Sequence, residues 1–330
     1  MSFSYSSDSL EDIHKTLMST LYDDYDFESA PRGKPIRELI AASFTLINPR
    51  NRIITSPTRN VNYGFAVGEL CWYIRGDNDL HTMQYYNKRM SQFSNDGQTI
   101  NSAYGYRMFK ARWTFDSQFD MILQELKADP DSRRAVMHIN ETSDLRDALT
   151  WEGGSKDVPC TMSLQLLIRN RKLHMHVLMR SNDVVWGMPY DVFSFTCLQE
   201  IFLYKLQELG VPVDDLGEYH HTAGSLHVYD THFDMAHKVS KEPDVEVAPM
   251  KPFTLKSIEN LALEDEPSIR NDSWADFVGC DDYGHHLDSI VWMYKHIVRH
   301  KNKRITEERL KELTRITEEL GLYDIEKKEI

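Results

Sequence analysis

The spacing of apolar residues predicts where the first helix of the chain lies. In SLEDIHKTLMSTLYD (9–23), apolar positions recur every three or four residues, the period that places side chains on one face of an α-helix. Ser9 and Asp12 have the spacing of a capping box. We therefore expect an amphipathic helix that is capped by Ser9.

The same pattern, together with residues that stop helices, predicts three more helices. Two of them cover 61–79 and 117–132, and we expect Gly76 and Pro130 to end them. The stretch 189–210 is apolar almost without interruption. A helix with that pattern is buried on most sides, so we expect a long core helix.

Short apolar runs predict strands between these helices. TMSLQLLIRN (161–170) and KLHMHVLMRSND (172–183) flank a tight Arg-Lys turn, which is typical of a β-hairpin. Other strands are expected over 39–48 and 133–140, and the stretch 219–238 predicts a strand that runs into a helix. This mixture favours an α+β fold, in which a mixed sheet packs against helices.

The length of the chain, 330 residues, allows one large domain or two ordinary ones. We see no internal repeat and no low-complexity linker. We interpret 1–250 as one catalytic domain and 251–330 as a C-terminal helical extension packed on it. The extension contains two charged stretches that look helical, over 285–301 and 306–321.

Composition limits the partners of the protein. The formal net charge of −13 disfavours nucleic-acid binding over the whole surface. Apolar runs stay short of the roughly 18 residues that span a membrane, and the N-terminus lacks the pattern of a secretory signal. The four cysteines are too scattered for a disulfide framework, and neither they nor the histidines have the spacing of a metal site. We expect a cytoplasmic protein (in the host cytoplasm if viral) with no membrane, nucleic-acid or metal partner.

Cys160 is the first candidate for chemistry, because it follows Pro159 at the start of an apolar strand. The thiolate is the reactive form of cysteine, and nearby cations stabilise it. Arg180 stands on the other strand of the predicted hairpin. Taken alone, Cys160 is better explained as a small buried residue, and both interpretations stay open at this point.

Four arginines favour a site for a small anion. Arg32, Arg133, Arg134 and Arg180 all stand in loops or at strand ends next to Gly or Ser, and Ser181 follows the last of them. Guanidinium groups combined with a hydroxyl are typical of phosphate binding. Each arginine alone could be a solvated surface charge, but the four together make a phosphate site plausible.

Two other pairs of residues have both a structural and a functional interpretation. Asp183 and Asp191 flank a loop that contains Gly187, and an aspartate in a first helical turn is often there only for the helix dipole. His227 and Tyr229 alternate on a strand and therefore share a face. Periodicity does not tell whether that face is core or ligand site.

Eight short motifs, taken together and in order, resemble the thymidylate synthase family. They are PRG (31–33), GELCWYIRGD (68–77), AYG (103–105), SRR (132–134), PC (159–160), RSND (180–183), GMPYD (187–191) and HVY (227–229). The resemblance covers about residues 10 to 250. It implies a thymidylate-synthase-like α+β fold and a symmetric homodimer formed through the sheet.

The resemblance also implies a role for each candidate residue. Cys160 would add to C6 of a pyrimidine nucleoside monophosphate, Glu69 and Tyr104 would organise water and protons, and Asp191 would contact the base. The folate cofactor, 5,10-methylenetetrahydrofolate, would contact Asp183, Trp186 and Gly187. The residues that would bind the nucleotide are Arg32, Arg180, Ser181, Ser194, His227, Tyr229 and, in the partner subunit's site, Arg133 and Arg134.

Asp191 departs from the family pattern in a way that bears on the base. Thymidylate synthases carry Asn at this position, and its amide matches O4 and N3–H of uracil. A carboxylate instead accepts from the N4 amine of cytosine and favours a proton on N3. The resemblance is therefore closest to the deoxycytidylate or cytidylate hydroxymethylases, which trap the intermediate with water.

Three other departures concern the surroundings of the folate. Thr161 stands where the synthases have His, NKRMSQF (87–93) replaces a tryptophan-rich stretch, and Trp186 replaces a Leu. The first two alter the surroundings of the exocyclic methylene group, where hydride transfer and hydration compete. The chain ends in DIEKKEI rather than in a short apolar tail, so the sequence does not locate the segment that closes the site.

We therefore predict an enzyme that converts dCMP or CMP to the 5-hydroxymethyl product through a covalent adduct with Cys160. Methylation of dUMP, as in thymidylate synthase, and hydroxymethylation of dUMP are the alternatives. An alternative of another class is an inactive regulator that binds a nucleotide or a partner. The retention of Cys160 with the four arginines disfavours that last interpretation.

Overall fold

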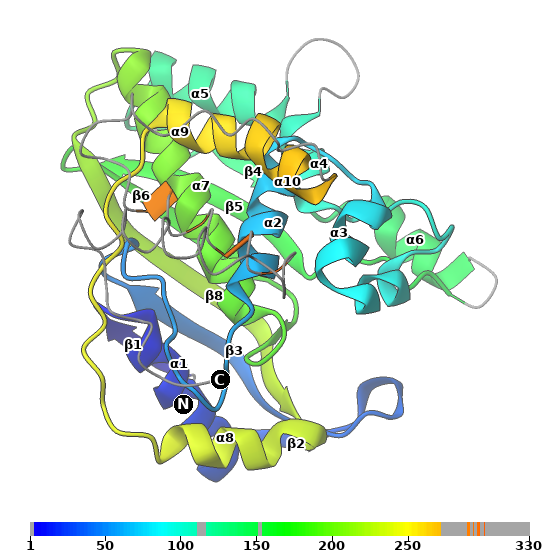
Figure 1. Cartoon of the computed structure of the whole chain (residues 1–330). Coiled ribbons are helices and arrows are strands. Elements are labelled where there is room, and N and C mark those ends of the chain that lie inside the picture. The colour runs from blue at the N-terminus through cyan, green and yellow to red at the C-terminus, as the bar shows by residue number, and fades with distance from the viewer. Residues whose placement is uncertain are drawn as a thin grey trace, which may run out of the picture.

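The computed structural model describes residues 3–110, 117–150 and 154–271, together with residues 289, 290, 293, 296, 297 and 300. Within these residues, one eight-stranded sheet forms the base of the fold (Figure 1). Its strands are β1 (Ser4–Ser7), β2 (Phe27–Ser29), β3 (Ile36–Leu46), β4 (Val136–His138), β5 (Thr161–Arg169), β6 (Lys172–Met179), β7 (Asn182–Asp183) and β8 (Asp215–Tyr229).

Strand β8 lies in the middle of this sheet. The strand order is β1-β3-β8-β6-β5-β4, while β2 pairs with β3 and β7 pairs with β8. Because β8 is antiparallel to β3 but parallel to β6, the sheet is mixed, as predicted. The two residues of β7 pair with the end of β8, which sets Asp183 opposite His227.

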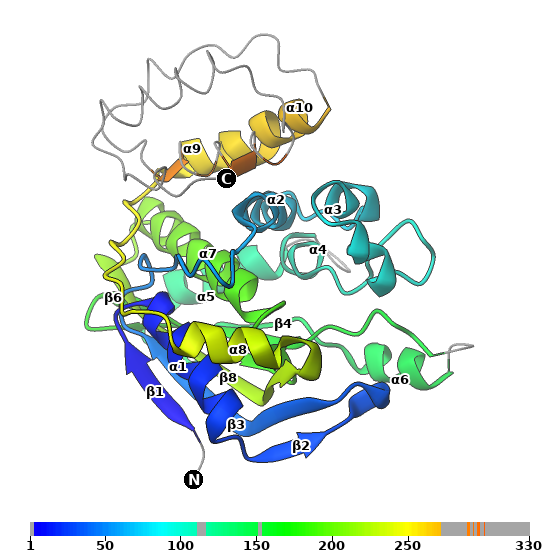
Figure 2. The ribbon, with the colours of Figure 1, turned by 60° about the horizontal axis from the view of Figure 1, so that its bottom comes forward.

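The described helices lie mainly on one face of the sheet (Figure 2). The α-helices are α1 (Leu10–Asp23), α2 (Tyr63–Ile74), α3 (Leu80–Tyr86), α4 (Tyr104–Phe109), α5 (Gln118–Ala128), α6 (Thr142–Thr150), α7 (Met188–Glu208), α8 (Phe233–Ser240), α9 (Leu255–Asn260) and α10 (Glu266–Arg270). Short 3-10 turns are η1 (Pro31–Gly33), η2 (Lys88–Phe93) and η3 (Asp230–His232), and the π-helical segment η4 (Leu261–Asp265) joins α9 to α10.

The hydrophobic core lies between the sheet and these helices. Helix α7 runs through it and is buried along nearly its whole length, as its apolar sequence predicts. On α1, the fully buried residues Leu10, Ile13, Leu17 and Leu21 follow the helical period and face β3 and α8. Amphipathic and all-apolar helices therefore occupy the outer and inner positions that their patterns predict.

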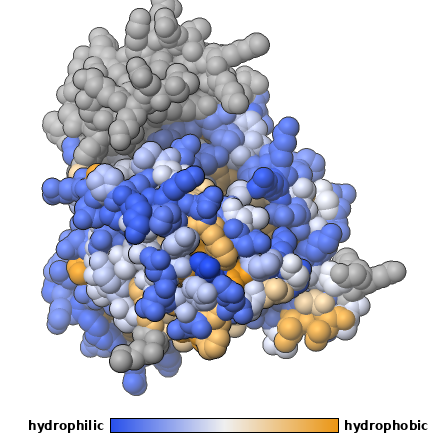
Figure 3. All heavy atoms as spheres, turned by 90° about the horizontal axis from the view of Figure 1, so that it is seen from below, coloured by the Kyte–Doolittle hydropathy of each residue, from blue (hydrophilic) through white to orange (hydrophobic). Residues whose placement is uncertain are grey.

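The outer surface is mostly hydrophilic (Figure 3). A hydrophobic patch is visible in the region of α6, where Leu145 and Leu149 are 64% and 78% exposed. No helix among the described residues is long and apolar enough to span a membrane.

The first helix lies where the sequence predicts it, but the predicted capping box is wrong. The side chain of Ser9 makes no capping hydrogen bond at the start of α1. The carboxylate of Asp12 instead accepts a hydrogen bond of 2.7 Å from the hydroxyl of Tyr5. Strand β1, which the sequence analysis missed, supplies Tyr5 and thereby replaces the local cap with a tertiary contact.

The other predicted helices are confirmed with shorter ends. The helix predicted over 61–79 is α2, followed by Gly76 in a left-handed conformation (φ 58°). The helix predicted over 117–132 is α5, which ends two residues before Pro130, since a residue before proline disfavours the helical conformation. The helix predicted over 189–210 is α7.

The predicted hairpin is also confirmed, with its turn one residue earlier than expected. Strands β5 and β6 pair antiparallel, and the turn residues Asn170 and Arg171 have φ values of 51° and 58°. The strand predicted over 39–48 begins earlier, at Ile36, and the strand predicted over 133–140 is reduced to β4. The stretch 219–238 forms the end of β8 followed by η3 and α8, as predicted.

Residues 251–271 pack against the helices of the first part of the chain. The carboxylate of Glu266 accepts hydrogen bonds of 2.7 Å from both Arg75 and Tyr86. Apart from six scattered residues, the helical stretch predicted over 285–301 lies outside the described residues, as does all of 306–321. The division of the chain at residue 250 therefore stays a prediction.

Candidate active site

Cys160 and Arg180 meet at the open end of the β5–β6 hairpin. Cys160 directly precedes β5 and Arg180 directly follows β6, and the Nη2 atom of Arg180 lies 3.7 Å from the Sγ atom of Cys160. The same guanidinium donates to the carbonyl oxygens of Pro159 (2.9 Å) and Val158 (3.1 Å). Arg180 therefore both faces the sulfur and fixes the backbone that leads to it.

The charges around Cys160 act on its thiol in opposite directions. Burial raises the pKa of Cys160, and the carboxylates of Asp191 and Asp183 add to this effect, whereas Arg180 and Arg32 oppose it. The neutral thiol is therefore favoured at rest. Ionisation of Cys160 depends on the two arginines.

Asp191 lies in the first turn of α7, and its carboxyl is buried. The Nδ2 atom of Asn182 donates to Oδ2 of Asp191 at 2.8 Å. Burial raises the pKa of Asp191 to about 7, although the hydrogen bond from Asn182 lowers it. Near neutral pH this carboxyl therefore changes between a hydrogen-bond donor and a pure acceptor.

A chain of hydrogen bonds runs from Asn182 into the core. Oδ1 of Asn182 lies 3.1 Å from Nε2 of His221, and Nδ1 of His221 lies 2.9 Å from the hydroxyl of Tyr219. Burial lowers the pKa of His221 to about 3, so its ring is neutral. The sequence analysis missed all three residues, although Tyr219 and His221 alternate on one strand face.

Glu69 on α2 is half-buried, and its carboxyl lies close enough to Asp191 for their charges to interact. Burial raises the pKa of Glu69 to about 8, and the charge of Asp191 adds to this effect. A hydrogen bond with Tyr73, which the sequence analysis did not single out, acts in the opposite direction on that pKa. At neutral pH Glu69 therefore holds a proton that it can donate.

Tyr104 begins α4 and lies next to the candidate nucleophile. Its hydroxyl accepts a hydrogen bond of 3.3 Å from the backbone N–H of Thr161, the residue after Cys160. Helix α4 approaches α2 closely because Gly105 has no side chain. A Cβ atom at Gly105 would lie 2.2 Å from the Cα atom of Tyr73.

Asp183 has one satisfied and one unsatisfied carboxylate oxygen. Its Oδ1 accepts hydrogen bonds from the backbone N–H groups of Val185 (2.7 Å) and Trp186 (3.2 Å). Its Oδ2 is buried and has no hydrogen-bond partner among the described residues. Burial raises the pKa of Asp183. A buried oxygen without a partner is a natural acceptor for a ligand.

Two residues that the sequence analysis missed hold the ring of Trp186 beside Asp183. The indole Nε1 donates to Nε2 of His232 at 3.2 Å, and the guanidinium carbon of Arg89 lies 5.0 Å from the ring centroid. Trp186 is nevertheless 42% exposed. The indole therefore offers a partly open, flat surface in the loop that connects β7 to α7.

Gly187 precedes α7 at a point where a side chain would crowd its neighbours. A Cβ atom there would lie 3.0 Å from Nδ2 of Asn182 and 3.1 Å from Oδ2 of Asp191. Glycine at this position therefore leaves space for the hydrogen bond between those two residues. The predicted contact of Gly187 with the folate stays a prediction.

His227 and Tyr229 lie together at the end of β8, as their alternation predicts. Their rings meet edge to face with centroids 5.2 Å apart. Burial raises the pKa of Tyr229, Asp183 and Cys160 add to this effect, and Arg32 opposes it. Arg32 therefore acts on the same group of side chains as Arg180, although it lies in the exposed turn η1.

The remaining predicted nucleotide-binding residues are less closely joined to this group. Arg133 and Arg134 are exposed before β4, and Nε of Arg134 donates to Glu125 at 2.9 Å. Ser181 is half-buried after Arg180, and Ser194 is fully buried on α7 with no hydrogen-bond partner for its hydroxyl in the described part of the chain. Their roles stay predictions.

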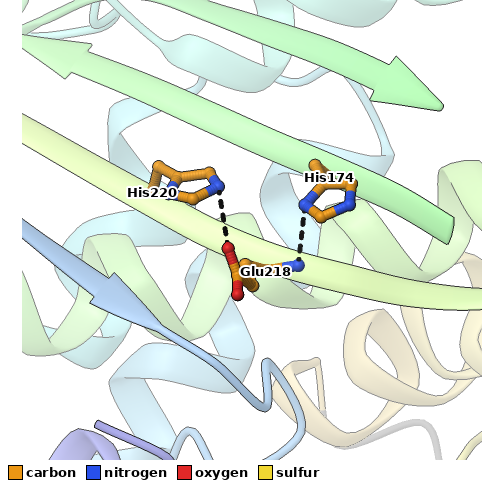
Figure 4. A group of neighbouring side chains, drawn as sticks. All are labelled: His174, Glu218 and His220. Carbon is orange, nitrogen blue, oxygen red and sulfur yellow. Dashed lines mark hydrogen bonds and ion pairs between the residues drawn. The ribbon is translucent and has the colours of Figure 1, made fainter. Parts of the chain in front are cut away.

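A separate trio of His174, Glu218 and His220 lies on neighbouring strands β6 and β8 (Figure 4). Their potential metal-ligand atoms lie within 4.8 Å of one another, a proximity that the spacing of these residues in the sequence did not suggest. Nδ1 of His174 already accepts a hydrogen bond of 3.1 Å from the backbone N–H of Glu218. Because that lone pair is occupied, the trio is well explained as a hydrogen-bonded cluster.

Comparisons with known proteins identify the family of the chain. A family model described as Thymidylate synthase matches residues 29–289. The Deoxyuridylate hydroxymethyltransferase of Bacillus phage SP01 is 34% identical over 236 residues, which are 69% of this chain and 59% of that protein. The chain therefore matches less than two thirds of the length of this relative.

Two other relatives carry the synthase name. The Thymidylate synthase of Bacillus subtilis subsp. natto is 28% identical over 244 residues, 71% of this chain and 81% of that protein. The solved structure of thermostable thymidylate synthase A from Bacillus subtilis superposes with a TM-score of 0.60 at 22% identity and covers 76% of this chain and 91% of that one. The fold is thus thymidylate-synthase-like, and the match of the family model over most of the chain shows that it belongs to the thymidylate synthase family.

Proposed function

We propose that the protein is a one-carbon transferase that hydroxymethylates C5 of a cytosine nucleotide, dCMP or CMP. The observation that carries this proposal is the buried carboxyl of Asp191, held by Asn182 in the same site as Cys160. In its ionised form this carboxylate accepts from the N4 amine of cytosine and stabilises a proton on N3. That proton offsets the negative charge that develops on the ring when a thiolate adds to it.

Cys160 is the nucleophile of the proposed reaction. Its thiolate adds to C6 of the pyrimidine, which makes C5 nucleophilic, and covalent catalysis of this kind divides one difficult step into easier ones. Arg180 lies close enough to stabilise the thiolate. In this proposal Arg32, Arg180, Ser181 and Ser194 bind the phosphate and base ends of the nucleotide, and His227 and Tyr229 bind the sugar.

The residues around Asp183 fit a folate cofactor. The unpartnered Oδ2 of Asp183 can accept a hydrogen bond from the pterin, and Trp186 and Gly187 flank it. When bound, 5,10-methylenetetrahydrofolate supplies the one-carbon unit. Asp183 and the exposed ring of Trp186 orient the cofactor beside the base.

In the proposed reaction, Glu69 and Tyr104 transfer protons and position water. Because the pKa of Glu69 is about 8, this residue is protonated at neutral pH and acts as a general acid whose conjugate base then orients water. Once the C5 proton and tetrahydrofolate have left, water would add to the exocyclic methylene group on C5, and the thiolate of Cys160 would leave C6 to give the 5-hydroxymethyl nucleotide. Tyr104 lies at the nucleophile through its hydrogen bond to Thr161.

The quaternary structure and the location in the cell are part of the proposal. A homodimer formed through the sheet would place Arg133 and Arg134 at the phosphate site of the partner subunit. Their exposure before β4 leaves both side chains available for that contact. Residues 1–250 would form the catalytic domain and 251–330 its helical extension, in a cytoplasmic enzyme.

Hydroxymethylation of dUMP is the second candidate, for two reasons. Relatives from Bacillus phage SP01 and Pseudomonas phage M6, 34% and 30% identical, are named Deoxyuridylate hydroxymethyltransferase. Moreover, with a pKa of about 7, Asp191 is partly protonated at neutral pH and can donate to O4 of uracil. Methylation of dUMP would in addition require hydride transfer and would release dihydrofolate.

Mass analysis of the products from dCMP, CMP and dUMP with 5,10-methylenetetrahydrofolate tests the proposal. We expect 5-hydroxymethyl products from a cytosine nucleotide, no dihydrofolate absorbance, and loss of turnover in Cys160→Ser. Cys71→Ser, which alters a buried cysteine on α2, is the matched control and should retain turnover. Full activity of Cys160→Ser, or a product from dUMP alone, would contradict the respective part of the proposal.

A further inference from the structure

We propose that Tyr219, His221 and Asn182 are positioning residues that determine which oxygen of Asp191 the pyrimidine base meets. The inference rests on the proposed function only in that Asp191 contacts the base. The three residues come from the core strand β8 and from β7, and they reach Asp191 from the side of the protein interior.

The four side chains form one continuous line of hydrogen bonds. The successive distances are 2.9 Å from Tyr219 to His221, 3.1 Å from His221 to Asn182 and 2.8 Å from Asn182 to Asp191. Tyr219, His221 and Asn182 are 0%, 1% and 3% exposed. Water therefore does not compete for these bonds, and each buried polar atom in the line depends on its neighbour.

With the amide oxygen of Asn182 turned towards His221, as in this structure, the direction of every hydrogen bond in this line follows. The amide oxygen of Asn182 only accepts, so Nε2 of the neutral His221 must carry the proton and donate. Nδ1 of His221 is then an acceptor, and the hydroxyl of Tyr219 must donate to it. At the other end, the NH₂ group of Asn182 donates to Oδ2 of Asp191.

This direction makes the two oxygens of Asp191 unequal. Oδ2 faces a donor, and a carbonyl oxygen accepts a hydrogen bond better than a hydroxyl oxygen does, so a proton on the neutral carboxyl is favoured on Oδ1. Oδ1 has no hydrogen-bond partner among the described residues. Oδ1 is thus left to face the base, as an acceptor when ionised and as a donor when protonated.

Packing keeps the line in register. The ring of Phe44 stacks on His221 with centroids 4.6 Å apart and planes within 9°. Gly187 leaves the space in which Asn182 and Asp191 meet, as described above. The tautomer of His221 and the orientation of the Asn182 amide are therefore set from within the fold, before any nucleotide binds.

The first test uses no ligand. In ¹⁵N-histidine NMR spectra of the full chain, with His221→Gln as the assignment variant, His221 should show the neutral Nε2–H tautomer from about pH 5 to pH 8. Tyr219→Phe removes the donor to Nδ1 and should change the His221 signals. An Nδ1–H tautomer, or titration of His221 in this range, would overturn the inference.

The second test measures base discrimination by binding. The ratio of the Kd values for dUMP and dCMP should change at least threefold in Tyr219→Phe and about tenfold in Asn182→Ala. In Asn182→Ala, the midpoint of any pH dependence of that ratio should also move to higher pH, because a donor to the ionised form is lost. Tyr63→Phe, which removes another buried tyrosine hydroxyl, bonded to Ile54, is the matched control and should leave the ratio unchanged.

The two tests separate this inference from the proposed function. If the wild type prefers dUMP, the proposal for cytosine fails, yet the tautomer and the changes of the ratio in the variants are still expected. If folded Tyr219→Phe and Asn182→Ala proteins keep the wild-type ratio, the positioning role fails whichever base is preferred. Near-UV circular dichroism establishes whether each variant is folded.

Discussion

At the scale of single residues, Cys160 and Arg180 owe their proximity to one hairpin. The guanidinium of Arg180 lies 3.7 Å from the sulfur and is held there by the carbonyl oxygens of Val158 and Pro159. Burial raises the pKa of Cys160, and Arg180 works against that effect. The reactivity of the thiol should therefore depend on Arg180, the larger of the two arginine effects on its pKa.

The variant Arg180→Gln should slow the alkylation of Cys160 by iodoacetamide about threefold to tenfold, because the thiolate becomes rarer. Mass spectrometry of the peptide that contains Cys160 measures the rate. Arg171→Gln, at the other end of the same hairpin and paired with Asp214, is the control and should react like the wild type. Equal rates in all three proteins would show that Arg180 does not influence the sulfur.

The pKa of about 7 for Asp191 predicts that the preference for a base depends on pH. Below about pH 6 the carboxyl is protonated and donates, which suits O4 of uracil, whereas above about pH 8 it is ionised and accepts from the amine of cytosine. Affinity for dCMP relative to dUMP should therefore rise with pH.

Competition binding with the two nucleotides measures this effect. Asp191→Asn should abolish the pH dependence and move the preference towards uracil. A wild-type ratio that stays constant between about pH 6 and pH 8 would contradict the assignment of Asp191 to the base.

At the scale of elements, helix ends show how tertiary contacts compete with local signals. Ser117 and Asp120 form a complete capping box at the start of α5, whereas Ser9 stands at the same position of α1 without a capping bond. At the start of α1, the backbone N–H of Ser9 donates to Oγ of Ser7, and the carboxylate of Asp12 is bonded to Tyr5 of β1, so the second half of a capping box does not form.

Ser117→Ala should therefore lower the free energy of unfolding by about 1 kcal/mol, the usual effect of losing a cap. Ser9→Ala, the matched control, should change it by less than about half of that. Urea denaturation followed by circular dichroism measures both. A larger loss for Ser9→Ala than for Ser117→Ala would contradict the contacts described here.

At the scale of the whole molecule, buried ionisable groups make stability depend on pH. Burial raises the pKa values of Asp191 to about 7 and of Glu69 to about 8. Near these pH values the two carboxyl groups still hold protons in the folded state, whereas both have lost them in the unfolded chain. Burial lowers the pKa values of His14 and His221 to about 3, so these residues bind protons only after unfolding.

Between about pH 7.5 and pH 8.5 the histidines are largely neutral in both states, and the acids with raised pKa values dominate the slope. Stability should therefore fall as the pH rises through this window, since the folded state must lose protons that the unfolded state has already lost. Chemical denaturation at several pH values measures the slope, and Glu69→Gln should reduce it. A rise of stability over this window would contradict the pKa shifts of Glu69 and Asp191.

Much of the fold follows from the periodicity of the sequence. The pattern of α1, the continuous apolar run of α7 and the β5–β6 hairpin are local, and all three elements lie where they are predicted. Strands β1 and β2 and helices α3, α4 and α6 were missed, because segments of three to nine residues are too short to show a period. Their positions are fixed by pairing with distant strands or by packing.

The sequence by itself determined the family motifs, the candidate nucleophile and the presence of Asp191 where thymidylate synthases carry Asn. Residue identities and their order are enough for these conclusions. Only the tertiary structure decided which residues contact these side chains. Asn182, His221 and Tyr219 form a line of hydrogen bonds that ends at Asp191. His232 and Arg89 contact the ring of Trp186. Within this group, hydrogen bonds and a cation–π contact join residues that are up to about a hundred positions apart in the chain. Their effect on a carboxyl depends on distance in space and on exclusion of water, neither of which spacing along the sequence records.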